Sequence, residues 1–189
     1  MCQLSESAME KKTKLLFICL GNICRSPAAD GVMNHLVKTE GKEYDFEIDS
    51  AGIGSWHVGD LPDYRMRSTG MKRGYTFNHR ARQIELNDFA RFDYIIGMDV
   101  ENMNTLRRMK KQFLNSDESK GQKCAELLCL ADFLKHHQGQ TTVPDPYYGQ
   151  QRDFEFALDL IEDACGELLS QLLAGKSPSP TPPKGRGVC

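Results

Sequence analysis

Short apolar runs alternate with helical patterns along this chain, and this alternation constrains the fold more than any other feature. The first run, Leu15 to Cys19, is apolar throughout, as expected for a strand buried on both faces. Further strand-like runs occur at 46–51, 94–98 and 125–130, and the longest helical pattern spans 153–173. Strands that alternate with helices form a parallel sheet covered on both sides. We therefore predict an α/β fold, a single three-layer domain that binds ligands at the carboxyl ends of its strands.

The two ends of the chain differ in composition from its middle. Residues 1–13 are polar and aperiodic, and residues 175–189 hold four of the eight prolines. Neither segment is expected to pack well. We predict flexible tails at 1–13 and 175–189 and one domain at 14–174, which agrees with a length of 189 residues.

Composition excludes several classes of protein. The chain has 24 Lys and Arg against 26 Asp and Glu, so no global positive field attracts nucleic acid or an acidic membrane. No apolar run approaches the ~20 residues of a membrane span, and the first residues lack the apolar stretch of a signal peptide. Seven cysteines, an odd number, argue against a disulfide framework. We expect a protein of the reducing cytoplasm without nucleic-acid or membrane partners.

The segment CLGNICRS, residues 19–26, connects the first predicted strand to the first predicted helix, which we expect Ser26 to cap and Pro27 to begin. The backbone N–H groups of such a turn and the positive end of the helix dipole favour an anion. Arg25 adds a planar fork of donors that matches two phosphate oxygens. Cys19 in the same environment is favoured as a thiolate, which is a nucleophile for phosphorus.

Other interpretations of this loop fit its residues less well. A nucleotide-binding P-loop requires Gly-Lys, which is absent here. Buried structural thiols are a second interpretation, and for Cys24 this role and a redox role both stay open. Cys19 and Cys24 share a C-x₄-C spacing with Cys124 and Cys129, but residues five apart on a strand face opposite sides of the sheet. We therefore expect no metal site and no cofactor.

Six motifs stand in one order along the chain: CLGNICRSPAA at 19–29, SAG at 50–52, DYR at 63–65, HRARQI at 79–84, GMD at 97–99 and DPYYG at 145–149. Together they resemble the low-molecular-weight protein tyrosine phosphatase family. The resemblance covers most of residues 14–173 and implies a four-stranded parallel twisted sheet with helices on both faces. It also implies hydrolysis of phosphotyrosine in proteins, or of small aryl phosphates, through a cysteinyl-phosphate without metal.

The resemblance also implies residue roles. Cys19 matches the nucleophile, Arg25 the residue that grips the phosphoryl oxygens, and Asp145 the general acid. The chemistry itself requires such an acid, because the phenol that leaves has a pKa of ~10 and its departure is helped by a proton. Other positions match the phosphate loop and the aromatic walls of the pocket: Leu20, Gly21, Asn22, Ile23, Cys24, Ser26, Trp56, Tyr147 and Tyr148.

Within that set the resemblance implies finer roles. Asn22 matches the side chain that holds the shape of the loop, and Ser26 the hydroxyl that hydrogen-bonds the thiolate. Cys24 matches a cysteine that forms a protective disulfide with the nucleophile under oxidation. His79 and Asp99 match further family positions, where we expect them to support the site rather than react.

Three other functions are compatible with this fold. Arsenate reductases of this type need additional cysteines after the middle of the chain, yet residues 80–123 contain none. Arginine phosphatases carry threonine where this chain has Ile23. A phosphotyrosine-binding module without turnover is disfavoured by the presence of both Cys19 and Asp145. We expect a monomeric phosphatase that releases inorganic phosphate.

Overall fold

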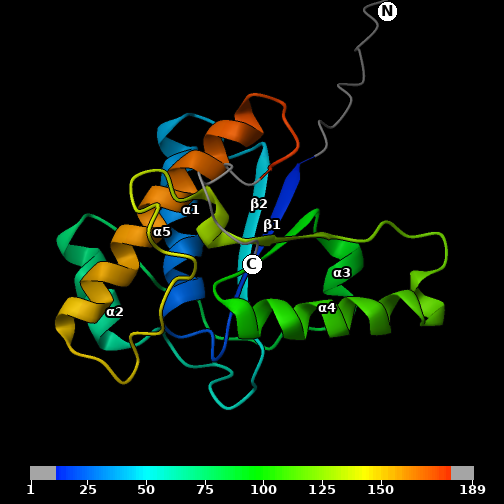
Figure 1. The fold of residues 1–189 in the computed structure, drawn as a ribbon, viewed down its shortest axis with the longest axis horizontal. Helices are drawn as coiled ribbons and strands as arrows, with labels where there is room; N and C mark the ends of the chain where they lie inside the picture. The colour runs from blue at the N-terminus through cyan, green and yellow to red at the C-terminus, as the bar shows by residue number, and fades with distance from the viewer. Residues whose placement is uncertain (1–11, 180–189) are drawn as a thin grey trace, which may run out of the picture.

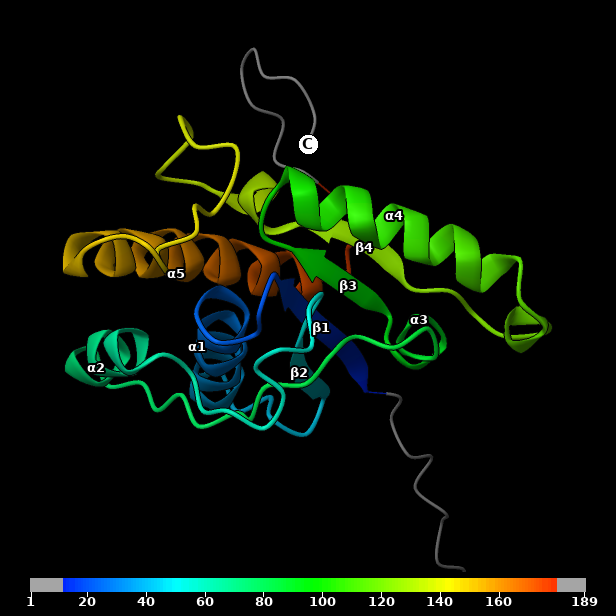
Figure 2. The same cartoon turned by 90° about the horizontal axis from the view of Figure 1, so that it is seen from below.

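Four parallel strands form the centre of the computed structural model, which describes residues 12–179. Figure 1 shows β2 beside β1, and Figure 2 shows the full strand order, β2-β1-β3-β4. Residues 15–18 of β1 are completely buried, because this strand has a neighbour on each side and helices on both faces. The predicted four-stranded parallel sheet is confirmed. The strands are β1 (Thr13–Cys19), β2 (Phe46–Gly52), β3 (Tyr94–Gly97) and β4 (Glu126–Cys129).

Helices cover both faces of this sheet, as Figure 2 shows. On one side lie α1 (Arg25–Thr39), α2 (Tyr64–Lys72) and α5 (Gln151–Leu173). On the other side lie α3 (Asp88–Arg91) and α4 (Val100–Leu114). The buried residues of α5 recur every three or four positions, which is the pattern of a helix with one apolar face. The predicted three layers are therefore present.

Two local predictions were wrong in detail. Ser26 does not cap α1: the helix begins at Arg25 with Cys24 at its N-cap, and the Ser26 hydroxyl points instead to the thiol of Cys19, 3.0 Å away. The helix expected at 85–91 contains only the four residues of α3. The Asp88 carboxylate accepts a hydrogen bond from the Glu85 backbone, so residues 85–87 form a turn rather than a helical start.

The strands end at one edge of the sheet. In the register of the sheet Cys19 lies beside Gly52, and Gly97 lies beside Cys129. The loops that follow these strands therefore meet at the same edge, which brings residues far apart in sequence together.

The predicted tails fall largely outside the described residues, which exclude 1–11 and 180–189. Thr13, which we placed in the N-terminal tail, is already the first residue of β1. No described helix has both the length and the apolar character that a bilayer span requires.

Candidate active site

The loop between β1 and α1 begins at Cys19, whose side chain is almost fully buried. Its backbone is held by β2 and the residues that follow, since Ile53 donates to the Cys19 carbonyl and Gly54 to the Leu20 carbonyl. Asn22 adopts a positive φ of 55°, which turns the chain sharply toward the helix. The loop is thus fixed at both ends, one on a central strand and the other on a helix.

A cavity of about 110 Å³ opens over this loop. It brings together the predicted nucleophile, the predicted arginine and Asp145 with aromatic side chains from two other loops. Its lining residues are Cys19, Leu20, Gly21, Ile23, Cys24, Arg25, Trp56, His57, Asp145, Tyr147 and Tyr148. Asn22 and Ser26 do not line the cavity; both are buried behind it.

Arg25 is 2% exposed and is held by two carboxylates. One terminal nitrogen donates to Asp99 Oδ2 at 2.6 Å and to the Val143 carbonyl at 3.1 Å, and the other donates to Asp145 Oδ2 at 2.7 Å. Burial alone lowers the pKa of Arg25, but the charges of Cys19, Asp145 and Asp99 outweigh it and raise that pKa. The buried Nε has no hydrogen-bond partner among the described residues, so it remains available to an oxyanion.

Asp99 and Asp145 reach Arg25 from different loops. Asp99 caps α4, where its Oδ1 accepts from the Asn102 backbone at 2.7 Å, so the same carboxylate anchors a helix and a guanidinium. Asp145 also accepts from the Tyr147 backbone at 3.2 Å, and its side chain is 39% exposed. Asp145 therefore has access both to solvent and to the cavity.

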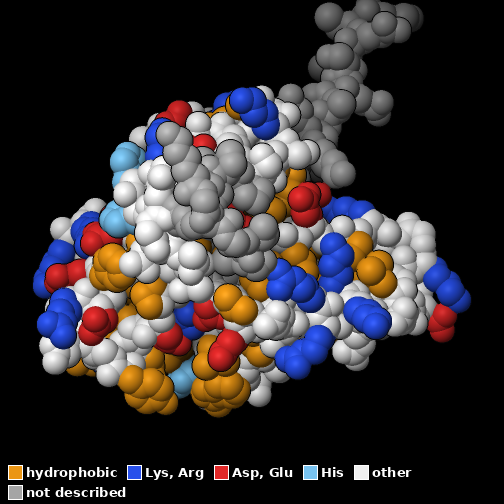
Figure 3. Space-filling model, in the orientation of Figure 1, with side chains coloured by type: hydrophobic (Ala, Val, Ile, Leu, Met, Phe, Trp, Pro, Cys, Tyr) orange, Lys and Arg blue, Asp and Glu red, His pale blue; other side chains and the backbone are white. Residues whose placement is uncertain are grey.

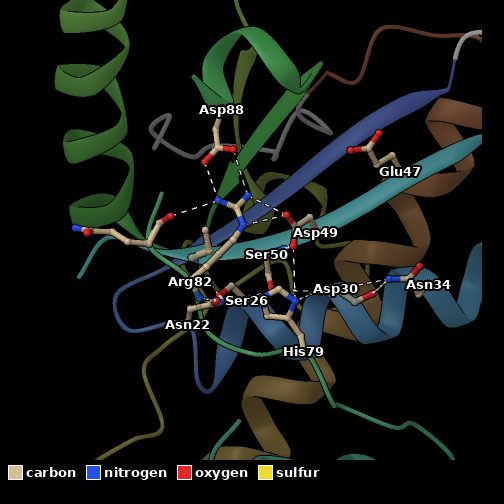
Figure 4. Close-up of polar contacts among 12 residues, drawn as sticks. Asn22, Ser26, Asp30, Asn34, Glu47, Asp49, Ser50, His79, Arg82 and Asp88 are labelled. Carbon is tan, nitrogen blue, oxygen red and sulfur yellow. Dashed lines mark hydrogen bonds and ion pairs between the residues drawn. The ribbon is translucent and has the colours of Figure 1, made fainter. Parts of the chain in front are cut away.

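A buried network of hydrogen bonds supports the loop from behind (Figure 4). The Asn22 amide nitrogen lies 2.9 Å from Ser26 Oγ and 3.0 Å from Ser50 Oγ, and its oxygen accepts from the Arg82 backbone at 2.9 Å. Ser50 in turn donates to Asp30 at 3.1 Å. The chain of contacts thus runs from the thiol of Cys19 through Ser26, Asn22 and Ser50 to a buried carboxyl group. Its expected effect is to hold the loop in one conformation.

His79 lies at the far end of this network. Its Nδ1 is 3.5 Å from Asp30 Oδ2 and 3.6 Å from Asp49 Oδ1, and within residues 12–179 it forms no hydrogen bond or ion pair with Cys19, Arg25 or Asp145. Burial raises the pKa of Asp30 to about 7 and lowers the pKa of His79. The supporting role of His79 stays a prediction.

Asp30, Asp49 and His79 are close enough to hold a metal ion, since their ligand atoms lie within 4.8 Å of one another. Each carboxylate already has donors, however: Arg82 binds Asp49, while Ser50 and Asn34 donate to Asp30. We therefore assign no metal to this cluster. None of the five described cysteines forms a disulfide.

Cys24 is buried at the N-cap of α1. Burial, followed by the charges of Asp63 and Cys19, raises its pKa, so this side chain stays a thiol and is a poor nucleophile at neutral pH. That Cys24 protects Cys19 by forming a disulfide under oxidation stays a prediction.

Two of the three predicted aromatic walls are exposed, and the third, Tyr147, is partly buried. Trp56 is 64% and Tyr148 is 98% exposed. Tyr147 packs edge-on against Tyr148, and its carbonyl accepts from Arg65 at 3.0 Å. The sequence thus indicated three pocket walls that the structure brings to one cavity.

His57 lines the same cavity and was missed by the sequence analysis. Its Nδ1 lies 3.2 Å from Asp60 Oδ2, and its ring lies over the backbone of Gly21. In the sequence, the one indication that His57 reaches the pocket is its position directly after Trp56, in a loop that contains Gly and Pro.

In this site a cysteine and a buried arginine face one small cavity, at a turn that joins a strand to the N-terminus of a helix. This arrangement defines a class of α/β proteins that bind tetrahedral oxyanions. Comparison with known proteins narrows this class. The family model described as low molecular weight phosphotyrosine protein phosphatase matches residues 14–177.

Individual relatives agree with this match. Low molecular weight phosphotyrosine protein phosphatase 1 of Drosophila melanogaster is 45% identical over 162 residues, which are 85% of this chain and 97% of the fly protein. The Gallus gallus enzyme is 40% identical over 83% of this chain and 94% of its own. A crystal structure of a protein tyrosine phosphatase from Entamoeba histolytica, with Hepes in the active site, is 38% identical. It has a TM-score of 0.76 and covers 87% of this chain and 99% of its own.

The chain therefore belongs to the low molecular weight phosphotyrosine protein phosphatase family, whose members are hydrolases. The resemblance drawn from its motifs is confirmed.

Proposed function

We propose that this protein hydrolyses phosphotyrosine by way of a phosphate ester on Cys19. The observation that carries the proposal is the convergence of Cys19, Arg25 and Asp145 on one cavity, although they come from separate segments of the chain. Ser26 Oγ lies 3.0 Å from the Cys19 sulfur, within hydrogen-bond distance of the attacking atom. The helix N-terminus and Arg25 add positive charge on the same side of the sulfur.

The first step transfers the phosphoryl group. Cys19 Sγ attacks phosphorus while the bond from phosphorus to the phenolic oxygen breaks, and Asp145 donates its proton to that oxygen. Arg25 offers Nε and a terminal N–H to the phosphoryl oxygens. A phosphate dianion competes with Asp145 for Arg25, and its negative charge favours the protonated carboxyl group that this step requires.

The second step regenerates the enzyme. Asp145, now a carboxylate, takes a proton from water, and the water oxygen attacks phosphorus as the bond from sulfur to phosphorus breaks. Inorganic phosphate leaves and Cys19 returns to the thiolate. The mechanism needs an ionised Cys19 and a protonated Asp145 at its start, and we propose acid phosphatase activity as well.

The walls of the pocket support an aryl substrate. Trp56, Tyr147 and Tyr148 line the cavity together with the loop, and their flat rings favour the ring of a phenyl phosphate. We further propose that the protein acts as a monomer in the reducing cytoplasm. Support comes from a cavity built from one chain, and from a mechanism that needs Cys19 reduced.

Hydrolysis of para-nitrophenyl phosphate in the presence of EDTA tests the proposal. The parent should be active, and Cys19→Ser should lose activity by about four orders of magnitude or more, since it lacks the nucleophile. Equal rates would exclude the cysteine mechanism. Arsenate-dependent oxidation of thiols without phosphatase activity would support an arsenate reductase instead.

A further inference from the structure

Helix α4 carries a group of cations that the catalytic site does not use. Its outer side presents Arg107, Arg108 and Lys111, with Lys110 partly buried beside them, and Glu101 is the only acidic residue of the helix. These four cations are called the basic face of α4 below. Figure 3 shows Lys and Arg side chains gathered over this helix.

Three of the four cations of the basic face, Arg108, Lys110 and Lys111, have no carboxylate partner in the described part of the chain. Arg108 donates to Thr105 Oγ1 at 2.9 Å, and Lys110 donates to the Ala125 carbonyl at 2.7 Å, both uncharged oxygens. Among residues 12–179, neither these two nor Lys111 forms an ion pair, whereas the nearby Lys123 pairs with Asp93. The helix dipole stabilises cations only in the last turn of α4. Lys111 lies in that turn and Arg108 does not, so the dipole does not explain the presence of Arg108. The face therefore fits an anionic partner.

A second cavity connects this face to the candidate active site. It has a volume of about 190 Å³ and shares Leu20, Arg25 and Asp145 with the catalytic pocket. Its other end is lined by Glu101 and Thr105 of α4, and Thr105 is the residue that Arg108 contacts. A chain leaving the catalytic pocket over Leu20 thus has a path to the basic face.

We propose that the basic face of α4 binds an acidic segment of the phosphotyrosine-containing substrate protein. The proposal rests on the phosphatase function proposed above. Thr105 and Lys111 are about 9 Å apart along the helix, a span of about three residues of extended peptide. Glu101, which lines the second cavity, and Lys111 are about 15 Å apart along the helix, a span of about four to five residues of extended peptide, so we place the acidic segment about four to seven residues from the phosphotyrosine.

Residues directly beside the phosphotyrosine do not share this preference for acidic side chains. They pass Asp99 and Glu101, whose carboxylates line the groove, so acidic side chains gain nothing there. An anionic membrane meets the basic face less well, because the exposed apolar side chains of α4, Val100 and Leu114, lie at opposite ends of the helix and form no insertion surface.

The test compares three phosphotyrosine peptides of equal length. The distal peptide has Glu four to seven residues from the phosphotyrosine on both sides, the neutral peptide has Gln at those positions, and the proximal peptide has Glu beside the phosphotyrosine. Two double variants are compared with the parent. The α4 variant carries Arg108→Glu and Lys111→Glu, and the control variant carries Lys38→Glu and Lys72→Glu, an equal change of charge. The control cations are exposed on α1 and α2.

At low ionic strength the parent should hydrolyse the distal peptide with a kcat/KM about 3–10-fold above that of the neutral peptide. This advantage should disappear in the α4 variant, persist in the control and weaken with added salt, because it arises from exposed charges. The proximal peptide should show no advantage. Para-nitrophenyl phosphate should be hydrolysed equally by all three proteins, since it is too small to reach α4.

A parent without the distal advantage, or an α4 variant that keeps it, would overturn the proposal. Loss of binding to phosphatidylserine vesicles in the α4 variant, with no change toward the peptides, would assign the face to membranes instead. If no protein hydrolyses any substrate, the proposed function fails. Binding to the basic face is then measured by fluorescence anisotropy, with the distal and neutral peptides and with the parent and the α4 variant each carrying Cys19→Ser. Tighter binding of the distal peptide that the α4 variant loses would support the binding surface, and equal binding of the two peptides would overturn it.

Discussion

Replacing Gly52 by alanine tests how the phosphate loop is positioned, because this residue touches the loop without supplying any reacting group. A Cβ at Gly52 would lie 3.0 Å from the carbonyl carbon of Gly21 and 3.1 Å from both Cβ and N of Asn22. Ordinary carbon contacts are about 3.5–4.0 Å, so the loop backbone must move by about half an ångström. No flexible side chain can absorb this displacement.

The substitution should lower both activity and stability. A misplacement of about 1 Å can cost about 100-fold in rate, so we expect kcat for para-nitrophenyl phosphate to fall by about 10–100-fold. Overpacking of this size costs about 1–3 kcal/mol, which in a domain of this length lowers Tm by about 3–10 °C. Both quantities are measured on the same preparation, by steady-state kinetics and by thermal unfolding.

Gly166→Ala is the matched control, because a Cβ at this position in the middle of α5 has nothing within 4 Å. It should leave kcat unchanged and raise the free energy of unfolding by about 0.5–1 kcal/mol. If Gly52→Ala lowers Tm but keeps kcat within about twofold of the parent, contact with β2 does not set the catalytic geometry of the loop.

Three further predictions concern the network and the general acid. Asp145→Ala should slow phosphotyrosine more than aryl phosphates with acidic leaving groups, which need little protonation; equal slowing across a leaving-group series would contradict its role as the acid. Asn22→Ala should destabilise the protein by about 1 kcal/mol more than Asn22→Gly, because both lose the same hydrogen bonds but only glycine tolerates a φ of 55° freely; equal denaturation midpoints would argue against strain at this position. Burial raises the pKa of Asp30 from 3.8 to about 7, so the native state keeps a proton that the unfolded chain releases. The free energy of unfolding of the parent should therefore fall as the pH rises between these values, and that of Asp30→Asn should fall less. Urea denaturation at a series of pH values measures both; parallel curves for the two proteins would contradict the prediction.

The strands could be predicted closely from the sequence, because a parallel strand buried on both faces is a continuous apolar run. β1 exceeds its predicted run by two residues, Thr13 and Lys14, which are only partly buried and carry no apolar signal. The site motif could be predicted for a similar reason, since Cys19 and Arg25 both lie in one short segment between a strand and a helix.

Other features depend on contacts that no local pattern contains. Ser26 followed by proline has the pattern of a cap, but the neighbouring Cys19 and Asn22 determine where its hydroxyl points. His57 is held by Asp60 at the pocket, an arrangement that only the folded loop creates. The support that Arg82 gives to Asn22 spans 60 residues, so sequence spacing gave no indication of it.

The partners of Arg25 have a consequence for how activity arises during synthesis of the chain. Asp99, Val143 and Asp145 follow Arg25 by 74, 118 and 120 residues. A nascent chain that has exposed only its first half contains the cysteine and the turn, yet nothing holds the guanidinium against them. Contacts this distant in sequence form late in folding. Turnover is therefore a property of the finished domain, and partly synthesised chains should leave cellular phosphoesters intact.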